Sequence, residues 1–250
     1  MSADEDFFIG WQAKAPQPDR RFLLGASVGL VAAATATGAG FAQRKPGPGH
    51  GRWNQNVVAQ YSGVLTETPY PALLTTDNAG GLVAMLLVGY GKAGLPRLNG
   101  PPAHVELAAS ALVRGAQTML AIADAEAFAR MPRPRAADAD AAEVDLGPAI
   151  RLGEILDAKC WFGAMNPGFG LTHKACAALC ARGGLPLAFC SIGECAEGED
   201  EVCLFLDERG DPHGRALAAF VADPIVASGR LVRRNGMLEY RVAIGSLRRA

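Results

Sequence analysis

Residues 226–242, VASGRLVRRNGMLEYRV, carry the clearest fold signal in this chain. Two apolar-rich runs meet at Asn235-Gly236, a residue pair that supplies the positive φ angles of a tight hairpin turn. Gly229 interrupts the first run, and a glycine inside a strand marks a bend or a bulge. Such a bent hairpin is typical of the closing strands of a small Greek-key barrel of the oligonucleotide/oligosaccharide-binding (OB) type.

The same pattern occurs earlier, in residues 105–122, VELAASALVRGAQTMLAI. Both stretches show a strand, a bend at small residues, Leu-Val-Arg, a tight turn, Met-Leu and a second strand. Further upstream, 62–66 corresponds to 152–157 and 82–88 to 202–206. Because an internal repeat fixes the number of domains, we expect a mainly β chain with two OB-like β-barrel units in tandem. The alternative is a sandwich of two meandering sheets.

Composition and charge narrow the class of protein. The chain has 250 residues, of which 50% are hydrophobic, so it can bury a core. Its net charge is −1, whereas nucleic-acid-binding domains are typically basic. We therefore expect no nucleic-acid partner.

Residues 22–42, FLLGASVGLVAAATATGAGFA, are uncharged and about as long as the twenty residues that span a bilayer. Arg20 and Arg21 precede them in a twin-arginine export pattern, and 40–42 is a small-x-small site for signal peptidase. The segment is predicted to be a transmembrane helix or a cleaved signal. Aromatic residues within 7–11 favour a retained anchor, because they suit the membrane interface.

This pattern predicts an organisation and a location for the whole chain. Residues 1–21 are expected to form a cytoplasmic tail, and the protein to be a single-pass protein of the bacterial inner membrane with its C-terminal domains in the periplasm. The predicted segments after the membrane helix are a Pro/Gly-rich linker at 43–56, a first β-unit at 57–126, a second linker at 127–145 and a second β-unit at 146–250.

The second unit contains an insertion, within residues 153–186, that the first unit lacks. A strand is expected to end at Asp157, and a helix is predicted over 173–182, with Thr172 as its N-cap and a stop at Gly183-Gly184. Positions 173, 176 and 180 then share one helix face, which Cys160 can reach from the strand end. The predicted metal ligands are Cys160, His173, Cys176 and Cys180.

Three sulfurs and one imidazole form a complete tetrahedral ligand set for zinc. Met165 in the intervening loop adds a soft thioether, which makes copper(I) an alternative. Disulfides are a second possibility, because an exported protein meets an oxidising compartment and Cys190, Cys195 and Cys203 supply further partners. Free redox-active thiols are a third, since Cys176 lies in the first helical turn, where thiolates are stabilised.

The strings DAKC at 157–160 and HKACAALCARGGLP at 173–186 resemble uncharacterised bacterial membrane-anchored or exported proteins with a D-x-x-C…H-x2-C-x3-C element. The segments FFIGW at 7–11 and RRFLLG at 20–25 are similar to the start of the same group. The resemblance implies a recurring Cys/His element on a barrel-like domain. It implies no particular activity.

These observations favour a non-enzymatic, membrane-anchored accessory protein that binds a metal or cofactor through the Cys/His element and docks a membrane redox complex. No His-Glu-x-x-His motif occurs. One alternative is a periplasmic thiol-redox protein with Cys176 as nucleophile and Cys180 or Cys160 as resolving thiol. Another is an interaction module stiffened by disulfides.

Overall fold

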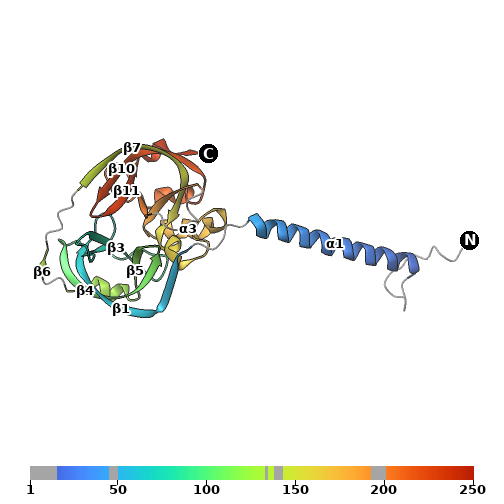
Figure 1. Cartoon of the computed structure of the whole chain (residues 1–250), viewed down its shortest axis with the longest axis horizontal. Helices are drawn as coiled ribbons and strands as arrows, with labels where there is room; N and C mark the ends of the chain where they lie inside the picture. The colour runs from blue at the N-terminus through green and yellow to red at the C-terminus, as the bar shows by residue number, and fades with distance from the viewer. Residues whose placement is uncertain (1–15, 45–49, 133–134, 138–142, 193–200) are drawn as a thin grey trace, which may run out of the picture. The chain divides into compact units, whose positions relative to one another are not determined.

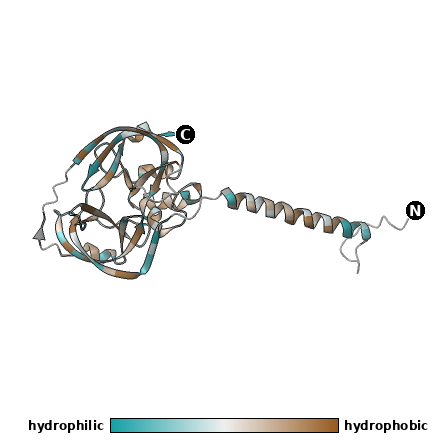
Figure 2. Cartoon of the chain, in the orientation of Figure 1, coloured by the Kyte–Doolittle hydropathy of each residue, from teal (hydrophilic) through white to brown (hydrophobic). Residues whose placement is uncertain are grey.

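The computed structural model describes residues 16–44, 50–132, 135–137, 143–192 and 201–250, in two units, Met1–Pro46 and Gly47–Ala250. The first unit contains helix α1 (Gln17–Arg44), whose segment Gln17–Gln43 is long and apolar enough to cross a membrane. Figure 2 shows its apolar character. The expected apolar helix is confirmed, and it extends beyond 22–42 at both ends, from Gln17 to Arg44.

The second unit consists of two closed five-stranded barrels (Figure 1). The strands of the first barrel are β1 (Arg52–Thr66), β2 (Ala72–Thr76), β3 (Leu82–Gly89), β4 (Ala103–Arg114) and β5 (Gln117–Ile122). Those of the second are β7 (Glu143–Asp157), β8 (Leu187–Ser191), β9 (Cys203–Leu206), β10 (Ile225–Arg234) and β11 (Met237–Val242). Two short strands extend the sheets, β6 (Arg135–Ala136) beside β4 and β12 (Arg248–Arg249) beside β10.

Both barrels have the same connectivity, which confirms the tandem repeat. Within each one, the first strand pairs with the second and the fourth, the second with the third, and the third with the fifth. The third and fifth strands run parallel in both barrels, and the other closing pairs are antiparallel. This arrangement is a small Greek-key barrel of the OB type.

The hairpin that suggested the fold forms as expected. β10 and β11 pair antiparallel up to Arg234↔Met237. Between them, Asn235 and Gly236 have φ values of 51° and 77°. These are the left-handed angles that a two-residue hairpin turn requires.

Both linkers are shorter in the structure than the sequence predicts. β1 begins at Arg52, inside the linker expected at 43–56, because its first residues pair with the end of β4 (Arg52↔Val113). In the linker expected at 127–145, helix α2 (Ala125–Ala129) packs Phe128 into the first barrel, and β7 already begins at Glu143. Long-range pairing thus orders residues whose local composition is typical of loops.

The core has three clusters of buried side chains. One fills each barrel, and the third lies between the barrels and contains residues of both, among them Leu112 and Met119 of the first and Leu156 and Leu204 of the second. The insertion between β7 and β8 contributes Trp161 to this shared core. The two barrels therefore pack as one body around the insertion.

Candidate metal centre

Four potential ligands meet in the insertion of the second barrel: Asp157, Cys160, Cys176 and Cys180. One carboxylate oxygen and three sulfurs all lie within 4.8 Å of one another. Three of the four residues are buried, and Cys176 is partly exposed. A group of four potential ligands, most of them shielded from water, could hold a metal ion.

Local structure explains how the first two ligands are placed. β7 ends at Asp157, where the sequence predicted a strand end. The chain then turns through the single π-helical turn Cys160–Ala164, and Asp157 Oδ1 accepts the Cys160 N–H at 2.8 Å. The carboxylate thus fixes the backbone that carries Cys160.

The other two sulfurs come from helix α3 (Lys174–Arg182), close to the predicted helix at 173–182. Its N-cap residue is His173, not Thr172, because Thr172 lies inside a preceding 3-10 turn, Leu171–His173. The helix ends at Gly183, as expected.

His173 lies behind the ligand group instead of within it. Its Nε2 is 2.8 Å from Asp157 Oδ2, and both side chains are fully buried. Asp157 takes the place expected for His173, because the 3-10 turn aims the imidazole at the carboxylate. Metal sites commonly pair a ligand with such a hydrogen-bonded neighbour, which orients the ligand. His173 Nδ1 is buried and has no hydrogen-bond partner within the described residues.

The three sulfurs are thiols, not disulfides. Cys160 Sγ and Cys176 Sγ are 3.9 Å apart, far beyond the roughly 2.0 Å of a disulfide. Within the described part of the chain, Cys160, Cys176, Cys180 and Cys203 are free, so these four do not support the disulfide alternative. Cys195 lies outside the described residues.

Electrostatics distinguishes the two buried thiols. The pKa of the Cys160 thiol is raised, chiefly by a hydrogen bond with Cys180 and to a smaller extent by burial. The same hydrogen bond lowers the pKa of Cys180, because the Cys160 S–H donates to the Cys180 sulfur. One sulfur of the pair is therefore prepared to act as a thiolate ligand.

Two lysines, neither of them anticipated from the sequence, surround the sulfurs. Lys92, from the loop after β3, donates to Cys176 Sγ at 2.7 Å, and this hydrogen bond raises the pKa of Lys92. Lys159 is buried and donates to the carbonyls of Gly89, Tyr90 and Gly91 at 2.6, 2.6 and 2.9 Å. Burial lowers the pKa of Lys159, while Cys160, Cys180 and Asp157 act in the opposite direction.

Close backbone contacts hold the Lys92 loop against α3. Gly94 N donates to the carbonyl of Gly183 at 2.8 Å. A Cβ atom on Gly183 would lie only 1.8 Å from the Lys92 carbonyl oxygen. Gly183 is therefore required for this close approach.

The distance between two of the sulfurs is compatible with a tetrahedral metal site. Tetrahedral zinc with Zn–S bonds of about 2.3 Å places its sulfurs about 3.8 Å apart, close to the distance between Cys160 and Cys176. Three thiolates and one carboxylate carry four negative charges. A divalent ion with Lys92 and Lys159 balances them.

Met165, the soft ligand that suggested copper(I), is exposed and is not a member of the ligand group. The remaining set mixes sulfur with a carboxylate oxygen. Copper(I) prefers soft sulfur ligands, whereas zinc accepts carboxylate oxygens readily. The group therefore combines three soft sulfur ligands with one harder oxygen ligand.

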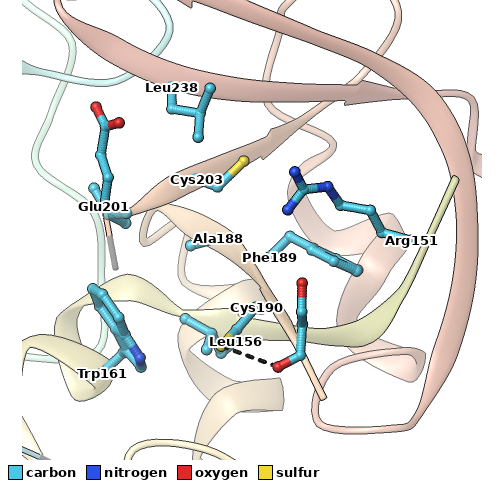
Figure 3. A pocket seen from close by; sticks show the side chains of 11 residues that line it. Arg151, Leu156, Trp161, Ala188, Phe189, Cys190, Glu201, Cys203 and Leu238 are labelled. Carbon is cyan, nitrogen blue, oxygen red and sulfur yellow. Dashed lines mark hydrogen bonds between the residues drawn. The ribbon is translucent and has the colours of Figure 1, made fainter. Parts of the chain in front are cut away.

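Cys190 and Cys203 lie elsewhere, along a pocket of the second barrel. Figure 3 shows them with Arg151, Trp161 and Glu201 around this pocket, whose lining includes none of the four ligands. Burial raises the pKa of the Cys203 thiol to about 12. Cys203 is thus an inert thiol at neutral pH.

Fold and site together define a class: a tandem OB-type barrel protein with an N-terminal apolar helix and a Cys3Asp group between its barrels. Comparisons with protein-family models, with curated proteins and with solved structures found no match.

Proposed function

We propose that this protein is a non-enzymatic, membrane-anchored exported accessory protein that binds a metal ion through Asp157, Cys160, Cys176 and Cys180. The observation that carries the proposal is the convergence of three free thiols and a carboxylate within 4.8 Å. Zinc is the proposed ion, and copper(I) is the alternative.

The proposed role of the ion is structural. Four protein ligands leave no open position for substrate, which is typical of structural rather than catalytic zinc sites. The ligands belong to the insertion, which packs against the first barrel through Lys92, Lys159 and Gly183. A bound ion would hold the insertion in the shape that joins the two barrels.

Metal analysis of the full chain tests this role. We expect one equivalent of zinc in protein purified in detergent, and loss of zinc in Cys160→Ser and Cys180→Ser. Cys203→Ser is the matched control, because Cys203 is also a buried free thiol but lies outside the ligand group. Wild-type protein without stoichiometric metal, or equal zinc loss in the Cys203 variant, would contradict the proposal.

The proposed location is the bacterial inner membrane, with the barrels in the periplasm. It is supported by the length and apolar character of α1 and by Arg20-Arg21 at its start. Topology reporters fused before Asp19 and after Arg249 test it. A cytoplasmic signal from the C-terminal fusion would refute the periplasmic location.

The proposed partner is a membrane redox complex. The outer side of β7 supports a docking role, because it exposes Val144, Leu146, Ile150 and Leu152 at alternating positions. Exposed apolar patches are characteristic of interaction surfaces. Leu146→Asp together with Ile150→Asp should release the protein from a larger complex in native electrophoresis of solubilised membranes. An unchanged mobility would exclude this face as the docking surface.

A thiol-redox protein is the second candidate, favoured by the contact of Cys176 with Lys92 and by the 3.9 Å between Cys160 and Cys176. In this function Cys176 is the nucleophile and Cys160 the resolving thiol. Thiol–disulfide exchange that persists in Cys176→Ser would exclude it.

A further inference from the structure

The contact between Lys92 and Cys176 is unusually short for a hydrogen bond to sulfur. The Nζ and Sγ atoms are 2.7 Å apart. In an N–H···O hydrogen bond the nitrogen and oxygen atoms are about 2.7–3.2 Å apart. Sulfur is larger than oxygen, so an N–H···S hydrogen bond is normally longer than about 2.7 Å. The observed separation matches two single bonds that meet at one bridging oxygen atom.

The pair is also the part of the site that an oxidant can reach. Lys92 is exposed and Cys176 is half-buried, whereas the Cys160 and Cys180 thiols are buried. Cys176 is therefore the thiol of this group most open to oxidation, and a primary amine lies directly against it.

The backbone holds the two residues together although 84 positions separate them in the chain. The Gly94–Gly183 hydrogen bond and the contact of Gly183 with the Lys92 carbonyl fix the loop on the end of α3. Such fixed proximity raises the effective concentration of two reacting groups. A covalent link between them needs no rearrangement of the barrels.

We propose that Lys92 and Cys176 form a redox-sensitive covalent N–O–S bridge. The S–H bond and one N–H bond break, and one S–O and one N–O bond form. Sulfur and nitrogen each lose two electrons, and dioxygen accepts all four. One of its oxygen atoms becomes the bridge, and the other leaves as water with the two hydrogens.

The bridge has a consequence for the metal that rests on the proposed function. A bridged Cys176 can no longer act as a thiolate ligand, so oxidation would break the Cys3Asp set and release the ion. Two equivalents of a dithiol reductant supply two electrons and two protons each, are oxidised to disulfides, and regenerate the thiol and the amine with release of water. The bridge itself does not depend on metal binding.

The experiment uses the full chain in detergent, first stripped of metal by a chelator and then exposed to dioxygen. Digestion without reductant and mass spectrometry should yield a peptide containing Lys92 joined to a peptide containing Cys176. The joined mass should exceed the sum of the two free peptides by one oxygen less two hydrogens. Dithiothreitol should separate them.

Variants make the assignment specific. Lys92→Arg keeps the positive charge but lacks the primary amine, and Cys176→Ser lacks the sulfur, so neither should give the joined peptides. Lys174→Arg is the matched control, because Lys174 begins α3 but its ammonium pairs with Asp223, and it should keep them. A Cys160–Cys176 disulfide or a sulfenic acid as the sole product, or joined peptides in Lys92→Arg, would overturn the proposal. Zinc content of the reduced protein tests the metal site separately.

Discussion

Replacing Lys159 with methionine tests whether this side chain joins the two barrels. Lys159 belongs to the insertion of the second barrel, is 3% exposed, and donates to three successive carbonyls of the first barrel. Methionine has a similar length and no charge, so it removes the three hydrogen bonds with little change in volume.

The expected loss follows from these contacts. Hydrogen bonds from a charged donor contribute about 1.5–3 kcal/mol each, and an unsatisfied buried carbonyl costs about 1–3 kcal/mol. The Gly89 carbonyl is buried, whereas the bonds to Tyr90 and Gly91 are only partly buried, so water can replace the ammonium there. Methionine carries no ammonium, so the variant avoids the desolvation cost of burying this charge on folding, which offsets part of the loss. We expect Lys159→Met to lower the free energy of unfolding by about 3 kcal/mol.

Urea unfolding of the metal-free full chain in detergent measures this change. Tryptophan fluorescence is a suitable signal, because the Lys159 ammonium lies 5.0 Å from the centre of the Trp53 ring. Lys174→Met is the matched control: its ion pair with Asp223 is partly exposed, so the loss should stay below about 1 kcal/mol. A Lys159→Met protein within about 0.5 kcal/mol of wild type would refute the reasoning.

Further predictions concern the ligands, the packing of α3 and the ion itself. Asp157→Asn should weaken zinc binding more than His173→Gln, because a residue that only orients a ligand is expected to contribute about 10–100-fold in metal affinity. Competition with a chromophoric chelator measures both affinities, and a larger effect of His173→Gln would contradict the assignment of Asp157 as ligand and His173 as its neighbour. Gly183→Ala should lower the free energy of unfolding by about 1–3 kcal/mol, since its Cβ would meet the Lys92 carbonyl, whereas Gly91→Ala, with no atom within 4 Å, should stay near wild type in the same urea assay. Chelation should lower the stability of the zinc-loaded wild type, by about 4 kcal/mol if free zinc was a thousandfold above its dissociation constant, and an unchanged melting curve would count against a structural ion.

Much of the fold could be read from local patterns. The Asn235-Gly236 turn and the repeated Leu-Val-Arg…Met-Leu hairpin predict two barrels, because turn angles and strand alternation are properties of neighbouring residues. The apolar run in α1 is equally local. Strand starts were less predictable, since Arg52 and Glu143 become strand residues only by pairing with β4 and β10.

The ligand group shows the same division. Helical spacing and the strand end at Asp157 predict that Cys160, Cys176 and Cys180 converge, and the structure brings them together. The sequence by itself thus determined the repeat, the apolar helix and three of the four grouped side chains. Only the tertiary structure decided that Asp157 joins the group while His173 hydrogen-bonds behind it, because a 3-10 turn reorients the residue before α3. The tertiary structure also brought Lys92 to Cys176, a contact across 84 residues that depends on how one barrel packs against the other.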